Sequence, residues 1–526
     1  MKEMSRLQQK RLEYRPLLPS VLRSLATASL IKIPFTPPSA AESLKSLFPH
    51  TWGKPPVAFE ASKHAKIVEP FRVGVVFSGG QAAGGHNVIA GLFDALKELH
   101  PESKLWGFIG GPSGIIDGKH KEIKKQDLEH YRNQGGFDLI GSGRTKIETP
   151  EQMKKALAVC ESLKLHGLVI IGGDDSNTNA ALLAEYFASE KNKTAVIGVP
   201  KTIDGDLRND HIEMSFGFDT ACKIYSELIG NIARDALSAK KYYHFIRLMG
   251  RSASHITLEC ALATRPNLVL ISEEIAKEKK SLKKIVSDIA DLIVQRSIEK
   301  KDYGVILIPE GLIEFIPEIK TLIKELNVNL KIDALTKESR EVFEFLPKEI
   351  QEQLLIDRDP HGNVQVSLIE TEKLLSILVA KELKARKESY KAKFSSITHF
   401  FGYEGRCGMP SNFDANYCYA LGCTAALLIR EEANGYTACI KNLRERIENW
   451  QPQGTPISLM FTFEKRQGKD KPVIKKYLVD LEDRPFQLFM KMRKNWQLED
   501  HYLYPGPMQF FGDPSITDAI PSILVI

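Results

Sequence analysis

The sequence predicts an α/β protein made of two doubly wound, Rossmann-like lobes with a helical insertion. Three observations support this fold class. Short apolar runs such as VGVVFSGG and GLVIIGG end in glycine turns, amphipathic stretches such as HNVIAGLFDALKEL follow them, and a second series of the same units begins near residue 240. Uninterrupted Val and Ile runs between helical stretches are typical of parallel strands covered on both faces.

Residues 1–70 form an N-terminal extension that we expect to wrap the body of the protein. They contain 9 of the 27 prolines and 11 Lys and Arg against 5 Asp and Glu. The net charge of +6 is therefore located in this segment, and the rest of the chain is balanced. Because a nucleic-acid surface needs basic residues clustered on the folded body, the charge distribution argues against a nucleic-acid partner.

The remaining chain divides into three predicted segments. Residues 71–232 form the first lobe, and TAVIGVPKT adds a further strand to it. Residues 233–430 form the second lobe, with strands in YYHFIRLMG, NLVLISEE and YGVILIPEG. Residues 312–395 interrupt it as a mostly helical insertion, because SLIETEKLLSILVAKELKARKES has helical spacing without glycine. Residues 431–526 complete the body, with strand alternation in SLMFTFEKR.

Composition indicates a soluble, cytoplasmic protein. The seven cysteines contain no CxxC pair, which suits a reducing compartment. No apolar run approaches the roughly 18 residues of a membrane helix, so no membrane association is expected. An organelle transit peptide is the alternative for the Arg- and Ser-containing N-terminus, although Glu3 and Glu13 argue against it.

Three glycine turns follow predicted strands of the first lobe: SGGQAAGGHN at 78–87, GGDDSNT at 172–178 and PKTIDGDL at 200–207. Ligands of open parallel sheets bind at the carboxyl ends of strands, so three such turns together outline one site. None matches GxGxxG or the Walker phosphate loop, and Arg208 occupies the third acidic position of an EF-hand loop. A tight strand-to-helix connection explains any one of the turns taken alone.

Two adjacent carboxylates, Asp174 and Asp175, stand where a helix begins after such a turn. Backbone N–H groups at a helix start favour an anion, which these side chains should repel. A divalent cation between carboxylate and phosphate would resolve the conflict, because Mg²⁺ is commonly held by one or two carboxylates plus phosphate oxygens. Helix capping is the structural alternative.

The third turn and the second lobe supply further polar groups. Lys201, Thr202, Asp204 and Asp206 lie close together in sequence, and phosphoryl transfer to a hydroxyl needs both a carboxylate and cations. Arg251 in MGR and Arg406 in YEGR are candidate phosphate clamps, and Glu310 in IPEG is suited to a sugar hydroxyl. Each of the three taken singly is also an ordinary surface or helix-start residue.

The motifs GGQAAGGHN, GGDDSNT, PKTIDGDL, MGR, IPEG and YEGR occur in the order found in phosphofructokinases, over roughly residues 73–433. The chain resembles the long, pyrophosphate-dependent branch of this family. The resemblance implies reversible, Mg²⁺-dependent transfer of phosphate from pyrophosphate to the 1-hydroxyl of fructose 6-phosphate, in glycolysis and gluconeogenesis. It also implies a homodimer with a substrate site shared across the interface.

The resemblance also assigns residues. Gly80 resembles the glycine that binds the donor phosphate, Asp174 the Mg²⁺ ligand and Asp204 the proton acceptor, with Asp206 also expected in the catalytic loop. The substrate-binding set that the resemblance implies comprises Thr202, Ile203, Asp204, Met249, Gly250, Arg251, Glu310, Tyr403 and Arg406, with Arg251 also expected to be catalytic. Lys241 and Tyr242 are expected to reach the substrate across the dimer interface.

Two positions predict the donor. ATP-dependent relatives have glycine at the position of Asp175 and usually at that of Lys201. A carboxylate at Asp175 would repel the α-phosphate of a nucleotide, whereas Lys201 would stabilise the transferring phosphoryl and the leaving phosphate. The alternatives are an ATP-dependent phosphofructokinase and a non-catalytic regulatory subunit, which would be expected to lose the catalytic loop.

Overall fold

The structure, a computed structural model, describes residues 4–35, 42–328, 332–358, 362–466, 469–506, 514–518 and 520–525. The backbone contacts divide the chain into two compact units. The first comprises Met1–Ala221, Arg406–Tyr477 and Gln509–Ile520, and the second comprises Cys222–Gly405, Leu478–Met508 and Pro521–Ile526.

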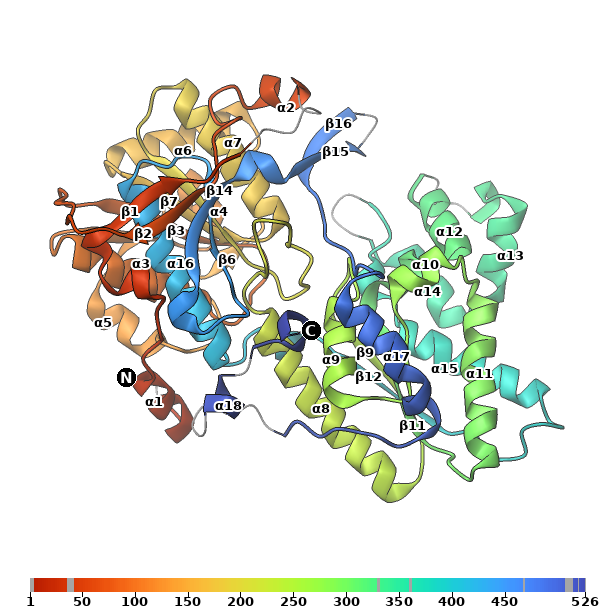
Figure 1. Cartoon of the computed structure of the whole chain (residues 1–526). Coiled ribbons are helices and arrows are strands. Elements are labelled where there is room, and N and C mark those ends of the chain that lie inside the picture. The colour runs from red at the N-terminus through yellow and green to blue at the C-terminus, as the bar shows by residue number, and fades with distance from the viewer. Residues whose placement is uncertain are drawn as a thin grey trace. The chain divides into compact units, whose positions relative to one another are not determined.

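A mixed sheet forms the centre of the first unit (Figure 1). Among the described residues it has ten strands, nine of them in the order β1 (Ala28–Lys32), β2 (Val57–Ala61), β14 (Gln451–Pro456), β13 (Tyr436–Lys441), β8 (Ala195–Pro200), β7 (Gly167–Gly172), β3 (Arg72–Ser78), β4 (Lys104–Phe108) and β5 (His120–Ile123). The tenth strand, β6 (Ser142–Gly143), pairs with the end of β3. The strands from β13 to β4 are parallel, and antiparallel strands extend both edges.

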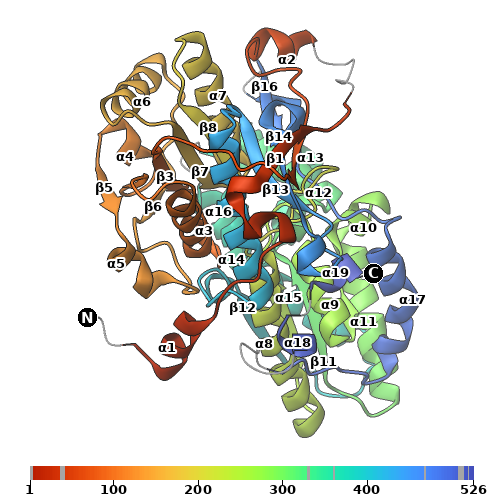
Figure 2. The same cartoon turned by 60° about the vertical axis from the view of Figure 1, so that its left-hand side comes forward.

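Helices cover both faces of this sheet. Figure 2 shows α3 (Gly85–Leu99) and α16 (Asn412–Arg430) on one face and α6 (Pro150–Ser162) and α7 (Asp174–Ser189) on the other. Every residue of β7 and β8 is buried, as expected for apolar strands with helices on both sides. The other helices of the unit are α1 (Arg6–Glu13), α2 (Glu42–Leu47), α4 (Pro112–Ile116), α5 (Lys125–Leu128) and α18 (Pro514–Thr517).

The second unit has a smaller parallel sheet. Its four strands among the described residues run in the order β10 (Leu268–Val269), β11 (Gly304–Pro309), β9 (Tyr243–Leu248) and β12 (Ser396–Phe401). The helices around it are α8 (Phe218–Ala239), which begins before the unit boundary, α9 (His255–Thr264), α10 (Ser272–Lys277), α11 (Leu282–Ile298), α17 (Arg484–Leu498) and α19 (Ser522–Val525).

The predicted insertion at 312–395 is helical in the described residues. It contains the helices α12 (Pro317–Val328), α13 (Lys337–Phe345), α14 (Lys348–Ile356) and α15 (Thr371–Ala385). Its β-structure in the described residues is limited to one isolated antiparallel bridge between Arg358 and Val364. Apolar side chains of these helices share one buried cluster with β9, β11 and α11. A buried ion pair of 2.6 Å between Arg247 Nε on β9 and Glu372 Oε2 on α15 fixes the insertion to the sheet.

The compact units divide the chain differently from the linear segments expected from the sequence. Residues 406–477 belong to the first unit, because α16 packs on α3 and β13 and β14 join the first sheet. The expected strand in SLMFTFEKR is β15 (Phe461–Arg466), which pairs with β16 (Lys469–Ile474) in a separate hairpin. No helix in the described ranges combines the length and apolar character needed to cross a bilayer.

Candidate functional site

The three glycine turns of the first unit begin at one edge of its sheet. Strands β3, β7 and β8 are parallel neighbours, and their last residues are in register, with Ser78 beside Gly172 and Gly172 beside Pro200. The expectation that these turns lie together is therefore confirmed. All three loops leave the sheet at the carboxyl ends of strands, where open α/β sheets bind their ligands.

Cationic side chains surround the first of these turns. Gly79 has a left-handed φ of +87°, and a Cβ added to it would lie 3.7 Å from the Nζ of Lys201. A Cβ added to Gly80 would overlap Nη2 of Arg406 and lie 3.7 Å from Nη2 of Arg144. The left-handed φ favours glycine at position 79, and a side chain at position 80 would displace the Arg406 guanidinium. The three cations therefore converge on this turn, where an anion would bind.

Lys201 is the buried member of this cationic group, with 6% of its surface exposed. The pKa of its ammonium is lowered to about 8, mainly by burial and then by the nearby cations Arg406 and Arg144, against the opposing effect of Asp204 and Asp174. The direction has a simple cause: an ammonium removed from water and placed near other cations is less stable in its charged form. A bound polyanion would restore that stability, so the electrostatics favour a phosphate-bearing ligand.

Arg144 is a site residue that sequence reasoning missed. It follows β6, a two-residue strand that pairs with the end of β3, and the Ser142 hydroxyl donates to the Gly79 carbonyl at 2.6 Å. The only signal in the sequence is a glycine- and serine-rich turn, GSGR, without a recognisable strand before it.

The two adjacent carboxylates have different partners. Gly173, which has no side chain, is the residue before α7, so neither aspartate is the N-cap residue. Asp174 Oδ2 lies 3.9 Å from Lys476 Nζ, whereas Asp175 Oδ1 lies 3.4 Å from Lys146 Nζ. The two positions in the first turn of α7 thus direct the carboxylates to different lysines, and the separate roles expected for Asp174 and Asp175 stay predictions.

The carboxylates of Asp174 and Asp206 converge on one cation. Asp206 Oδ2 lies 3.6 Å from the same Lys476 Nζ that Asp174 approaches. In the described part of the chain, no group of three or more His, Cys, Asp or Glu side chains forms a metal cage. Two carboxylates that share one positive group nevertheless fit Mg²⁺ well, because Mg²⁺ completes its octahedron with water and substrate phosphate oxygens.

The loop after β8, residues 201–207, is the predicted catalytic loop, and hydrogen bonds hold it in place. The Asp204 N–H donates to Thr202 Oγ1 at 3.1 Å, and the Ser215 hydroxyl donates to the Thr202 carbonyl at 3.0 Å. Within the loop, Ile203 is buried, and Gly205 adopts a left-handed φ of +72° between the two aspartates. This turn leaves Asp204 half-buried and Asp206 buried on the two sides of the glycine.

The second unit brings together the MGR, IPEG and YEG motifs. Strands β11, β9 and β12 are parallel neighbours whose last residues, Pro309, Leu248 and Phe401, are in register. The Gly250 N–H donates to Glu310 Oε2 at 3.0 Å, so the glutamate fixes the MGR turn. Gly311 is also required here, since an added Cβ would overlap the carbonyl oxygen of Arg251.

The residues of this group that are expected to bind the sugar phosphate differ in exposure. Arg251 is exposed, and Tyr403 has 70% of its surface exposed, whereas Glu310 is buried. Met249 is partly buried, and its N–H donates to the Phe401 carbonyl at 2.9 Å. Arg406, the last residue of YEGR, belongs by its contacts to the first unit, where its guanidinium donates to the Gln81 side chain at 3.0 Å.

Lys241 and Tyr242 do not lie near MGR in the same chain. They precede β9, whereas Met249 follows it, so the two groups are separated by the length of a six-residue strand, roughly 20 Å. Lys241 and Tyr242 are exposed, and Tyr242 has a left-handed φ of 67°. Their role in substrate binding across a dimer interface stays a prediction.

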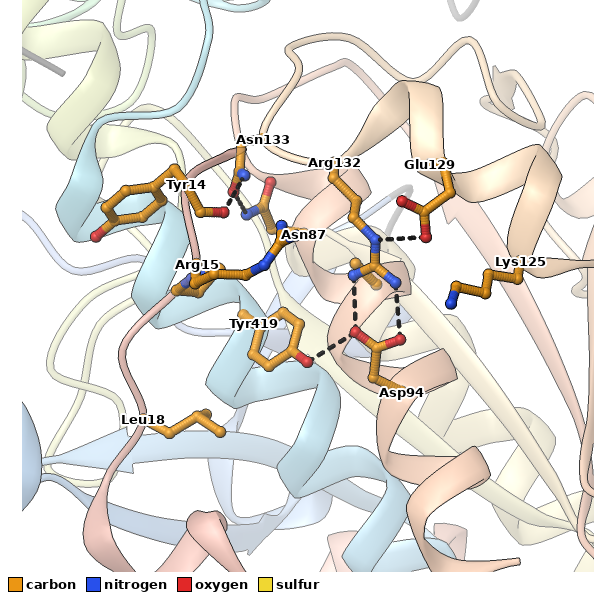
Figure 3. A pocket seen from close by; sticks show the side chains of 12 residues that line it. Tyr14, Arg15, Leu18, Asn87, Asp94, Lys125, Glu129, Arg132, Asn133 and Tyr419 are labelled. Atoms are coloured by element: carbon orange, nitrogen blue, oxygen red, sulfur yellow. Dashed lines mark hydrogen bonds and ion pairs between the residues drawn. The ribbon is translucent and has the colours of Figure 1, made fainter. Parts of the chain in front are cut away.

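A separate cavity of about 370 Å³ lies in the first unit (Figure 3). It is bordered by the N-terminal segment at Tyr14–Leu18, by α3 and by α16, and it contains none of the expected site residues. The Arg132 guanidinium donates two hydrogen bonds, of 2.7 and 2.8 Å, to the Asp94 carboxylate. The Tyr419 hydroxyl donates to the same carboxylate (Figure 3). The carboxylate is thus already paired, and this cavity is not part of the candidate site.

Comparison with known proteins gives the family. The family described as "Phosphofructokinase" matches residues 72–429. The chain belongs to the phosphofructokinase family. Proteins named pyrophosphate–fructose 6-phosphate 1-phosphotransferase are similar over nearly the whole chain: that of Porphyromonas gingivalis is 50% identical over 97% of this chain and 96% of its own length, and that of Treponema pallidum is 51% identical over 99% and 96%.

A solved member of the phosphofructokinase family has the same fold. The pyrophosphate-dependent phosphofructokinase of Nitrosospira multiformis aligns with a TM-score of 0.55 and 16% sequence identity, covering 86% of this chain and 95% of that structure. The expected fold class, two Rossmann-like α/β lobes of the phosphofructokinase type, is confirmed.

Proposed function

We propose that this phosphofructokinase transfers a phosphoryl group from pyrophosphate to the 1-hydroxyl of fructose 6-phosphate, reversibly and with Mg²⁺. The observation that carries this proposal is the group of three cations, Lys201, Arg406 and Arg144, around the Gly79–Gly80 turn, beside the carboxylates of Asp174 and Asp206. Cations for phosphate oxygens next to carboxylates for a metal are the arrangement that a metal–diphosphate donor requires.

The donor preference rests on Asp175. Its carboxylate is negatively charged, largely exposed and located at the start of α7, immediately after the metal-binding Asp174. A third phosphate and a nucleoside that extended past Asp174 would meet this charge, whereas pyrophosphate ends before it. The ammonium of Lys146, 3.4 Å away, holds the carboxylate at the edge of the site.

The chain's own residues support an in-line transfer. Asp204 accepts the proton of the 1-hydroxyl as its oxygen attacks the nearer phosphorus of pyrophosphate. The bond from that phosphorus to the bridging oxygen breaks, and inorganic phosphate leaves. Lys201, Arg144 and Arg406 stabilise the negative charge on the transferring phosphoryl and the departing phosphate, an effect that is largest in the transition state.

The metal and the sugar have separate binding groups. Asp174 and Asp206 would hold Mg²⁺, which supplies neutralisation of the phosphate oxygens when bound. In the second unit, Arg251 and Tyr403 supply exposed side chains for the phosphate and hydroxyls of the sugar, and buried Glu310 keeps the MGR turn in place. We include in the proposal a cytoplasmic location and a homodimer in which Lys241 and Tyr242 reach the partner's substrate.

Neither alternative from the sequence is favoured. An ATP-dependent enzyme would place a nucleotide against Asp175 and Lys201. A regulatory subunit would not need the catalytic loop, yet Asp204, Asp206 and Lys201 are all present and held by the loop contacts described above.

The test is ³¹P NMR of the purified chain with Mg²⁺, pyrophosphate and fructose 6-phosphate. We expect the pyrophosphate signal to be replaced by inorganic phosphate and by the new 1-phosphate of fructose 1,6-bisphosphate in equal amounts. Starting from fructose 1,6-bisphosphate and phosphate, the pyrophosphate signal should appear. Release of two phosphates without a sugar product would identify a pyrophosphatase instead and would refute the proposal.

A further inference from the structure

Lys476 reaches the donor site from a distant part of the sequence. Its ammonium lies 3.9 Å from Asp174 Oδ2 and 3.6 Å from Asp206 Oδ2, although the residue follows β16, more than 260 positions after either carboxylate. About a third of the Lys476 side chain is exposed. It therefore stands between the two carboxylates as a tethered cation that remains in contact with solvent.

The backbone at Lys476 is anchored on both sides. Before it, hairpin β15–β16 packs against α7, the helix that begins with Asp174. After it, the Tyr477 N–H donates to the Asp206 carbonyl at 2.8 Å, and the guanidinium of Arg208 lies 5.1 Å from the centre of the Tyr477 ring. These contacts hold the short segment against the catalytic loop, so the backbone that carries Lys476 is fixed beside the two carboxylates.

We propose that Lys476 is a donor-site residue that neutralises Asp174 and Asp206 in the free enzyme and binds a phosphate oxygen of the metal–diphosphate complex. This inference rests on the proposed function, because it assigns a role at the same site. A tethered +1 charge between two carboxylates opposes the binding of a bare divalent cation, since like charges repel and the ammonium occupies the space. A metal that arrives with pyrophosphate brings oxygens that can accept the ammonium, so the same lysine favours the complex.

The proposal predicts opposite effects on two ligands. Without Lys476, bare metal should bind more tightly, because the competing charge is gone. The metal–diphosphate complex should bind more weakly, because a charge-assisted hydrogen bond is lost. A lysine with a purely structural role would weaken both ligands together or neither, so the sign of the two changes separates the roles.

The experiment compares Lys476→Met with Lys475→Met, the exposed neighbouring lysine, as the matched control. Mn²⁺ binding is measured by electron paramagnetic resonance, and binding of methylenediphosphonate with Mg²⁺ by calorimetry, both without sugar. For Lys476→Met we expect Mn²⁺ to bind roughly 3- to 10-fold more tightly, the scale for a partly exposed ion pair. Methylenediphosphonate should bind about 10-fold more weakly.

Lys475→Met should leave both affinities at the wild-type values, and Lys476→Arg, which keeps the charge, should retain most of the methylenediphosphonate affinity. Wild-type Mn²⁺ affinity in Lys476→Met, or a parallel loss of both ligands, would overturn the inference. Because neither measurement requires turnover, an inactive wild-type enzyme would refute the proposed function while the two binding constants still decide the role of Lys476.

Discussion

The backbone N–H of Lys201 donates a 2.9 Å hydrogen bond to the carbonyl oxygen of Gly172. This bond continues the pairing of β8 with β7 one residue beyond the strands, and it fixes the loop that carries Asp204 to the turn that carries Asp174. The buried ammonium of Lys201 is thereby directed toward the Gly79 turn. The relative positions of the proposed base, metal ligand and phosphate-binding cation are thus determined by the ends of three adjacent strands.

Replacing Asp204 with alanine should abolish most of the turnover. We expect kcat to fall by roughly 10²-fold or more, the usual scale for loss of a general base, with little change in the affinity for fructose 6-phosphate. Initial-rate kinetics and sugar binding by calorimetry measure the two effects. Asp210→Ala, an exposed aspartate six residues further along, is the matched control and should keep its activity. Near-normal turnover of Asp204→Ala would remove Asp204 from the role of base.

The double variant Asp175→Gly, Lys201→Gly should lose its preference for pyrophosphate. Removing the Asp175 carboxylate removes the negative charge that a nucleotide extending past Asp174 would meet. Removing the Lys201 ammonium removes a positive charge that stabilises the transferring phosphoryl. We expect kcat/KM for pyrophosphate to fall by about 10²- to 10³-fold, as for loss of one preorganised donor of the transition state. The ratio of kcat/KM for ATP to that for pyrophosphate should rise, and an unchanged ratio would refute the account of donor selection.

The pH dependence of kcat/KM for pyrophosphate should follow the ionisation of Lys201. Because its pKa is lowered to about 8, mainly by burial, the ammonium is charged below that pH and neutral above it. The value of kcat/KM for pyrophosphate should therefore decline as the pH rises through about 8. In Lys201→Arg the guanidinium stays charged, so this decline should disappear even if the rate is lower. A decline at the same pH in Lys201→Arg would assign it to another group.

Loss of the buried Arg11 should destabilise the first unit. The Arg11 guanidinium donates to Asn412 Oδ1 at 2.6 Å and to the Pro410 carbonyl at 2.8 Å, which ties the N-terminal segment to the start of α16. Arg11→Ala should lower the free energy of unfolding by about 2–4 kcal/mol, because buried acceptors lose a charged donor. Urea unfolding measures the change, and Arg15→Ala, at an exposed position, should be within about 0.5 kcal/mol of wild type. Equal stability of the two variants would contradict this role.

The sequence predicted the strands and turns whose positions depend on neighbouring residues in the chain. The apolar runs of β3, β7 and β8 and the glycine turns after them could be recognised directly, and with them the positions of Gly80, Asp174 and Lys201. The catalytic loop followed from the same signals, because its residues continue from β8.

Long-range packing could not be predicted in the same way. Arg144 follows a strand of only two residues, and Lys476 is one of several lysines around a hairpin, with nothing in the local pattern to distinguish it from Lys475. Their places in the site depend on the pairing of β6 with β3 and on the packing of β16 against α7. The return of α16 to the first unit likewise depends on its contact with α3, more than 300 residues earlier in the chain.

The most direct test of the central claim is the rate of fructose 1,6-bisphosphate formation by the purified chain with Mg²⁺ and fructose 6-phosphate, measured with pyrophosphate and with ATP as donors. We predict turnover with pyrophosphate and a kcat/KM for ATP at least about 10²-fold lower, as expected when a charged group is placed in the path of the wrong donor. Turnover with ATP and none with pyrophosphate would contradict the roles assigned to Asp175 and Lys201.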